Sequence, residues 1–129
     1  MLDAKLVRSL NENSSPEVRS KVAARVSAEL SKGELSDVER GIAIEIVEHL
    51  ACDVEQQVRQ ALSEHIKSCP FLPTEVAREL ADDVDSVALP IIRYSSVLSE
   101  VDLISIVRRG SQIKHLAVAQ RQSVPGAVA

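Results

Sequence analysis

Residues 50–66, LACDVEQQVRQALSEHI, decide the fold prediction, because they read as the end of one helix, a tight turn and the first turns of the next. Leu50 and Ala51 close an apolar helix. Asp53 is placed to cap the following helix, since its carboxylate can accept hydrogen bonds from the free N–H groups of a first turn. The residues that then recur at helical spacing on one face are Val54, Val58, Ala61, Leu62, His65 and Ile66. The stretch predicts a helix–turn–helix unit, and a weaker copy follows in residues 80–92, LADDVDSVALPII.

The composition limits the classes of protein to which the chain can belong. Its 129 residues suffice for one domain with a continuous core, and 45% of them are apolar, but the only aromatic residues are Phe71 and Tyr94. The core must therefore be built from Ala, Val, Leu and Ile, which suits closely packed helices. The net charge of −4 argues against a nucleic-acid duplex as partner, because phosphate binding needs clustered excess Lys and Arg.

The apolar runs, the N-terminal residues and the cysteine content bear on the location of the protein. No run of eighteen apolar residues exists, so no membrane span is predicted. The N-terminal residues MLDAKLVRSLNEN lack the apolar core and the small-residue cleavage site of a secretory signal. Two cysteines do not make a disulfide framework. We therefore expect a cytoplasmic protein with no membrane partner.

Start and stop signals divide the chain into short helices. Ser15 followed by Pro16 is a helix start, and Gly33 is a helix end. The pairs Ser36 with Glu39 and Ser99 with Asp102 have the spacing of capping boxes. The predicted helices begin near residues 2, 16, 37, 54, 73, 86, 100 and 111. No segment alternates as a strand would, so the sequence predicts an all-α protein of about seven or eight short helices.

A repeat is visible in the numbering. Val58, Val87 and Leu116 are each 29 residues apart, and each is predicted to lie in the second helix of a pair. Periods of about 20 to 50 residues are typical of solenoids, in which each pair buries its apolar face by stacking on its neighbours. The solenoid is the favoured architecture, and a plain helical bundle is the alternative.

The spacing Leu50-Ala51-x-Asp53-x4-Val58-Arg59-x-Ala61-Leu62 resembles the HEAT repeat, in which an Asp in the turn and an Arg in the second helix recur. The stretch from Leu80 to Arg121 also resembles a HEAT-like bacterial family of unknown function. The segments that carry this second resemblance are LAxD from Leu80, VAxPI from Val87, LSxxDL from Leu98 and HLAVAxR from His115, and it is expected to cover about two thirds of the chain.

The resemblance implies an αα-superhelix, a HEAT-like solenoid, and no particular activity. Ala88 stands where the pattern has Arg, so a ladder of Asp–Arg pairs is expected to be interrupted there. We expect residues 1–129 to form a single HEAT-like domain, and whether it is the N-terminal part of a longer array stays open.

One group of residues has the spacing of a zinc finger, namely His49-x2-Cys52-x12-His65-x3-Cys69. The segment between the two ligand pairs reads as a helix, whose rise of about 1.5 Å per residue would separate the pairs by about 20 Å. One zinc ion cannot reach both pairs, so no metal site is predicted, and Cys52 and His65 are assigned to the packing. No cofactor or catalytic residue is predicted either, and Ser111 is interpreted as a helix cap.

The favoured function is a non-enzymatic scaffold that binds another protein, because stacked helices present a long surface. The predicted contact residues are Arg19, Arg59, Ser63 and Lys67 in the second helices. The alternative is an enzyme or a nucleic-acid-binding module on a HEAT-like fold, glycosylase-like or lyase-like. The acidic charge and the lack of Trp argue against the DNA-binding version.

The last predicted helix is rich in apolar residues, which include Ile113 and Leu116. A terminal repeat needs a polar outer face, so an uncovered apolar edge is predicted near residues 104–119. A second copy of the chain, a different partner or further residues of a longer chain could cover it. We favour self-association as a homodimer through the C-terminal helices, with Ile113 and Leu116 at the contact.

Overall fold

The computed structural model describes residues 15–121, and these residues form seven helices without a strand. The prediction of an all-α protein is therefore confirmed. The helix predicted near residues 2–10 lies outside the described residues. The helices are α2 (Pro16–Lys32), α3 (Asp37–Ala51), α4 (Gln56–Ile66), α5 (Thr74–Ala81), α6 (Asp85–Tyr94), α7 (Glu100–Arg109) and α8 (Gln112–Ala119).

Side-chain caps begin four of the seven described helices, α2, α3, α7 and α8, as the sequence predicts. The Ser15 hydroxyl accepts a hydrogen bond from the Val18 amide at 3.1 Å, and Pro16 is the first residue of α2. Gly33 ends α2 with φ 71°, a left-handed conformation that glycine adopts without steric cost. Ser36 and Glu39 form the capping box of α3, and Ser99 and Asp102 form that of α7.

The start and the buried face of α4 differ from the prediction. The helix begins at Gln56, because the Asp53 carboxylate accepts the Glu55 amide at 2.9 Å within the turn and does not cap the first turn of α4. Val54 therefore lies in the turn and is 88% exposed. His65 is exposed, and Ser63 is buried in its place, so the face of α4 is rotated relative to the predicted one.

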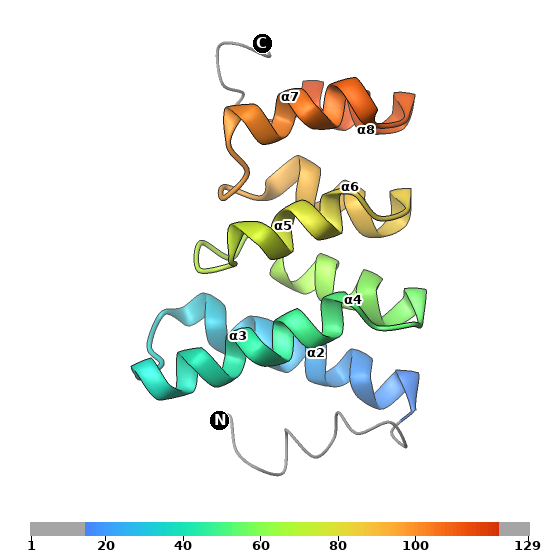
Figure 1. Cartoon of the computed structure of the whole chain (residues 1–129). Coiled ribbons are helices and arrows are strands. Elements are labelled where there is room, and N and C mark those ends of the chain that lie inside the picture. Colours follow the sequence, from blue (N-terminus) through green and yellow to red (C-terminus); the bar gives the residue numbers. More distant parts are fainter. Residues whose placement is uncertain (1–14, 122–129) are drawn as a thin grey trace.

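The helices stack in two layers (Figure 1). Helices α2, α4, α6 and α8 form one layer, in which each packs on the next, and α3, α5 and α7 form the other. Within the pairs α3–α4, α5–α6 and α7–α8, a short turn joins a helix of one layer to a helix of the other. The core between the layers is built from Ala, Val, Leu and Ile, as the composition requires, and its largest fully buried side chains include Leu30, Leu50, Leu62, Leu80 and Leu103.

The last helix does not keep the 29-residue repeat. Counted from the N-cap residues Glu55, Val84 and Ser111, the third residue is Val58 in α4, Val87 in α6 and Lys114 in α8. All three side chains are buried, whereas Leu116 is 56% exposed. The equivalence of Leu116 with Val58 and Val87 was therefore wrong by two residues, because the N-cap residue Ser111 follows Val84 by 27 residues, whereas Val84 follows Glu55 by 29.

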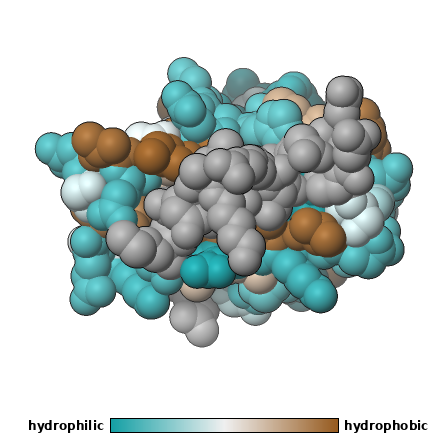
Figure 2. Space-filling view, turned by 90° about the horizontal axis from the view of Figure 1, so that it is seen from below, coloured by the Kyte–Doolittle hydropathy of each residue, from teal (hydrophilic) through white to brown (hydrophobic). Residues whose placement is uncertain are grey.

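Both ends of the described stack carry exposed apolar side chains. Figure 2 views the α2–α3 end, where apolar side chains lie among polar ones; Val18 of α2 and Val38 of α3 are exposed there. At the other end Ile113 and Leu116 of α8 are 52% and 56% exposed. Among residues 15–121, no helix is both long and apolar enough to cross a bilayer.

Candidate functional site

A row of polar contacts crosses the turns between the two layers and begins at α2. The Arg19 guanidinium donates to the Asp53 carboxylate through Nε at 2.7 Å and through a terminal nitrogen at 3.2 Å. Burial raises the pKa of Asp53, but the hydrogen bonds from Arg19 and from the Glu55 backbone outweigh it and hold the pKa below its usual value near 3.8. Asp53 is therefore ionised at neutral pH, and its ion pair with Arg19 joins the α3–α4 turn to α2.

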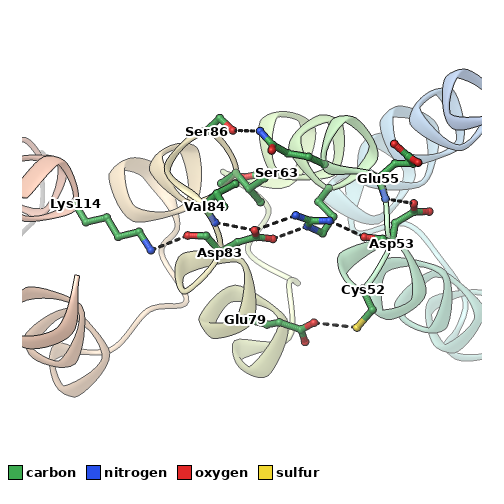
Figure 3. Close-up of polar contacts among 12 residues, drawn as sticks. Cys52, Asp53, Glu55, Ser63, Glu79, Asp83, Val84, Ser86 and Lys114 are labelled. Atoms are coloured by element: carbon green, nitrogen blue, oxygen red, sulfur yellow. Dashed lines mark hydrogen bonds and ion pairs between the residues drawn. The ribbon is translucent and has the colours of Figure 1, made fainter. Parts of the chain in front are cut away.

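Arg59 continues this row toward the C-terminus by joining Asp53 to Asp83, two residues that are labelled in Figure 3. Its guanidinium donates to both oxygens of Asp83, at 2.7 and 3.2 Å, and to the carbonyl of Asp53 at 2.8 Å. One side chain therefore connects the α3–α4 turn to the α5–α6 turn. Such a bidentate pair fixes geometry as well as supplying attraction, because the planar guanidinium matches the two carboxylate oxygens.

The ladder of Asp–Arg pairs is interrupted at Ala88, as predicted, and Lys114 from the next pair of helices continues the row of polar contacts. Ala88 is buried and offers no donor, so the Asp–Arg pair does not recur in α6. Lys114 of α8 donates instead to the carbonyl of Ala81 at 3.0 Å and, as Figure 3 shows, to that of Asp83 at 2.7 Å. Since Ala81 is the last residue of α5, the ammonium beside it also complements the negative end of that helix dipole. The polar row, defined as Arg19, Asp53, Arg59, Asp83 and Lys114, therefore extends from α2 to α8.

A separate ion pair joins the helices of the other layer. Arg78 of α5 donates through Nε to Asp102 of α7 at 2.6 Å. Burial raises the pKa of Asp102, but hydrogen bonds from the backbone and hydroxyl of Ser99 and from Arg78 lower it below its usual value near 3.8. Asp102 is thus ionised at neutral pH, although it is nearly buried.

Three of the four predicted contact residues serve the fold. Arg19 and Arg59 have their guanidinium groups engaged in the polar row. Ser63 is fully buried, and its hydroxyl donates to the carbonyl of Val87, so its assignment to a binding surface was wrong. These residues lie in α2 and α4, and the packing turns their polar groups toward neighbouring turns and helices.

Lys67, the fourth predicted contact residue, lies at the edge of an open groove between α4 and α6. Its ammonium is 3.6 Å from the Glu64 carboxylate and 4.8 Å from the centre of the Tyr94 ring. The groove has a volume of about 420 Å³. Its lining residues are Gln60, Glu64, Lys67, Ser86, Leu89, Pro90, Arg93 and Tyr94.

The groove combines the side chains that protein interfaces favour. Tyr94 is more than half exposed, Arg93 is exposed, and Leu89 and Pro90 supply the apolar part of the lining. Tyr and Arg are enriched at interface hot spots because each brings a large contact area together with polar groups. Sequence reasoning missed the α6 residues of the groove, although Tyr94, as one of two aromatic residues, was a usable signal.

The residues with zinc-finger spacing do not gather in the structure. The Cys52 thiol is exposed and donates to the Glu79 carboxylate of α5 at 2.9 Å, a contact that raises the pKa of the thiol. Cys69 is buried, whereas His65 is exposed, so the assignment of Cys52 and His65 to the packing was wrong. Within the part of the chain that the structure describes, no three His, Cys, Asp or Glu side chains cluster as a metal ion requires.

A family model matches the C-terminal part of the chain. It is described as an uncharacterised protein conserved in bacteria (DUF2336) and matches residues 87–129, one third of the chain. The resemblance to a bacterial family of unknown function is thus confirmed, over a shorter stretch than the two thirds expected from the motifs. No curated protein and no solved structure matches the chain.

Proposed function

We propose that this protein is a non-enzymatic scaffold that binds another protein through a HEAT-like αα-superhelix. The support for the HEAT-like architecture is the polar row: an acidic residue in the turn of a helix pair receives an Arg from a second helix, as in the repeat pattern that the sequence resembles. Stacked pairs of this kind present an extended surface on each layer. The proposed location is the cytoplasm.

The groove between α4 and α6 is the observation that carries the proposal. It brings the half-buried cation of Lys67 and the exposed cation of Arg93 together with the apolar side chain of Leu89. A partner segment with an acidic group near an apolar side chain would complement this arrangement, since charge complementarity orients the partner and the buried apolar contact holds it.

A pull-down from a lysate of the native host tests the proposal. The immobilised protein is expected to capture a partner, and Lys67→Glu together with Arg93→Glu should abolish the capture, because both changes place a negative charge in the groove. Arg25→Glu on α2 changes the charge in the same sense outside the groove and should leave the capture intact. Capture that is equal for all variants would show that the groove is not the contact site.

We also propose that the C-terminal end of the stack self-associates as a homodimer. Ile113 and Leu116 are both more than half exposed on α8, and a symmetric dimer is the commonest way in which two identical patches are buried. Light scattering over a range of concentrations should show a dimer that Leu116→Glu dissociates. Val38→Glu, a matched change at the other end of the stack, should leave it intact. A strict monomer at high concentration would refute self-association.

A further inference from the structure

A second hollow lies on the other layer, between α5 and α7. It has a volume of about 270 Å³. Whereas α4 and α6 pack together, α5 and α7 scarcely touch, so the space between them is open at the surface. The side chains that line the hollow are Arg78, Ala81, Asp82, Leu98, Val101, Asp102, Ser105, Ile106 and Arg109. A hollow of this size lies below the range of sites for drug-sized ligands and suits a single side chain.

Aliphatic side chains from three elements supply the apolar part of the hollow. Ala81, Leu98 and Ile106 are almost fully buried, so they form its base. Val101 at its border is 73% exposed, so this apolar side chain lies open to water. An aliphatic side chain placed here would remove Val101 and this base from water, which is the usual source of affinity in an interface core.

Two arginines that border the same hollow have guanidinium N–H donors without an acceptor among the described residues. Arg78 uses only Nε, on Asp102, so both of its terminal nitrogens lack a partner among the described residues. Arg109 uses Nε on Ser105 and one terminal nitrogen on Asp82, which leaves its other terminal nitrogen without one in residues 15–121. A guanidinium presents five N–H donors in a plane that matches a carboxylate.

The two acidic residues of the hollow do not satisfy these donors. One carboxylate oxygen of Asp102 accepts hydrogen bonds from the amide and the hydroxyl of Ser99, and the other accepts one from Nε of Arg78. Both oxygens are therefore already used, one of them in the capping box of α7. Asp82 is half exposed and pairs with Arg109 through one terminal nitrogen alone. The free donors of Arg78 and Arg109 therefore remain for a carboxylate that is brought in by a ligand.

We propose that the α5–α7 hollow binds the C-terminal residue of a partner protein, an aliphatic residue whose chain-terminal carboxylate lies beside its side chain. The aliphatic side chain packs between Leu98, Val101 and Ile106, and the carboxylate receives the free donors of Arg78 and Arg109. The inference rests on the proposed scaffold function for the nature of the partner. It concerns the layer of helices opposite to the α4–α6 groove, so the two sites can be tested separately.

The smallest probe with this chemistry is N-acetyl-leucine, titrated into the ¹⁵N-labelled full chain, and N-acetyl-leucyl-glutamic acid α-amide, whose only carboxylate is on the next side chain, tests the other source of a carboxylate. N-acetyl-leucine should shift the amide signals of Leu98, Ser105 and Ile106 saturably, with a roughly millimolar Kd, as expected for a ligand of about a dozen non-hydrogen atoms. Tighter binding of the second probe would overturn the assignment to a chain end. N-acetyl-leucinamide keeps the side chain and lacks the carboxylate, so it should bind about tenfold more weakly. Equal binding of the amide, or shifts confined to other residues, would overturn the proposal.

Variants separate the two halves of the proposed contact. Arg78→Gln should weaken binding of the carboxylate probe about tenfold, with little effect on the amide probe. Val101→Ser, at an exposed position that the fold does not need, should weaken both probes. Lys67→Gln in the α4–α6 groove should change neither. Dispersed amide spectra verify that each variant is folded, and an Arg78→Gln protein that is folded and binds normally would overturn the role of the arginine. Because the titration uses no cellular partner, it is independent of the pull-down result.

Discussion

Arg59→Met offers the sharpest test of the polar row, because it keeps an unbranched apolar stem and removes all the donors of the side chain. Three hydrogen bonds disappear, two to the Asp83 carboxylate and one to the Asp53 carbonyl. A hydrogen bond to a charged group contributes about 1.5–3 kcal/mol, and removing one partner of a fully buried ion pair costs about 3–5 kcal/mol. The Arg59 and Asp83 side chains are 19% and 15% exposed, so water can solvate the Asp83 charge that is left unpaired. The cost is therefore smaller than for a fully buried pair. We expect a loss of about 2–3 kcal/mol.

Urea unfolding followed by circular dichroism measures this loss, and Arg109→Met is the matched control. Arg109 also forms an ion pair, with Asp82, but the two side chains are 61% and 49% exposed, so the change should lie within about 0.5 kcal/mol. Combining Arg59→Met with Asp83→Asn should give less than the sum of the two single losses, since they remove the same interaction. Equal losses for Arg59→Met and Arg109→Met would refute the structural role of the row.

Three further outcomes are expected from the same unfolding assay. Leu62→Ala should cost about 2–5 kcal/mol, because Leu62 is fully buried, whereas Gln60→Ala at the groove should lie within about 0.5 kcal/mol, and equal costs would contradict the observed face of α4. Lys114→Met should cost about 1–3 kcal/mol by leaving the carbonyls at the end of α5 without their donor, and an unchanged midpoint would contradict that contact. Asp102 has a lowered pKa in the folded state, so its stabilisation is present above about pH 4 and is lost as the pH falls through the folded pKa. The acid-side decline should therefore be shallower in Asp102→Asn, and parallel pH profiles would contradict the shift.

Interactions between residues close in sequence were predictable. The capping pairs Ser36–Glu39 and Ser99–Asp102 join positions three apart, so their geometry depends on the backbone of one turn. Gly33 ends α2 for an equally local reason. Such signals established the all-α class and most helix ends before any tertiary contact was considered.

The candidate site was less predictable, because it depends on how helices face each other. The α4 residues Gln60, Glu64 and Lys67 become one wall of the groove only when α6 lies beside them. Helical spacing identifies an apolar stripe, and a stripe that includes Val54 and His65 looks as apolar as the observed one with Ser63. Which face of α4 is buried depends on α6, the helix packed against it, because the Ser63 hydroxyl donates to the Val87 carbonyl of α6.

The sequence by itself determined the helices, their caps and an aliphatic core, since these follow from periodicity and from contacts within a single turn. Only the tertiary structure decided the partners of the long charged side chains. Lys114 shows why: its position in the chain marks it as a surface residue of α8, yet packing places it at a core position, where it is stable because the carbonyls of Ala81 and Asp83 lie within its reach. A buried charge needs such partners, and they come from residues more than thirty positions away, which no local pattern reveals.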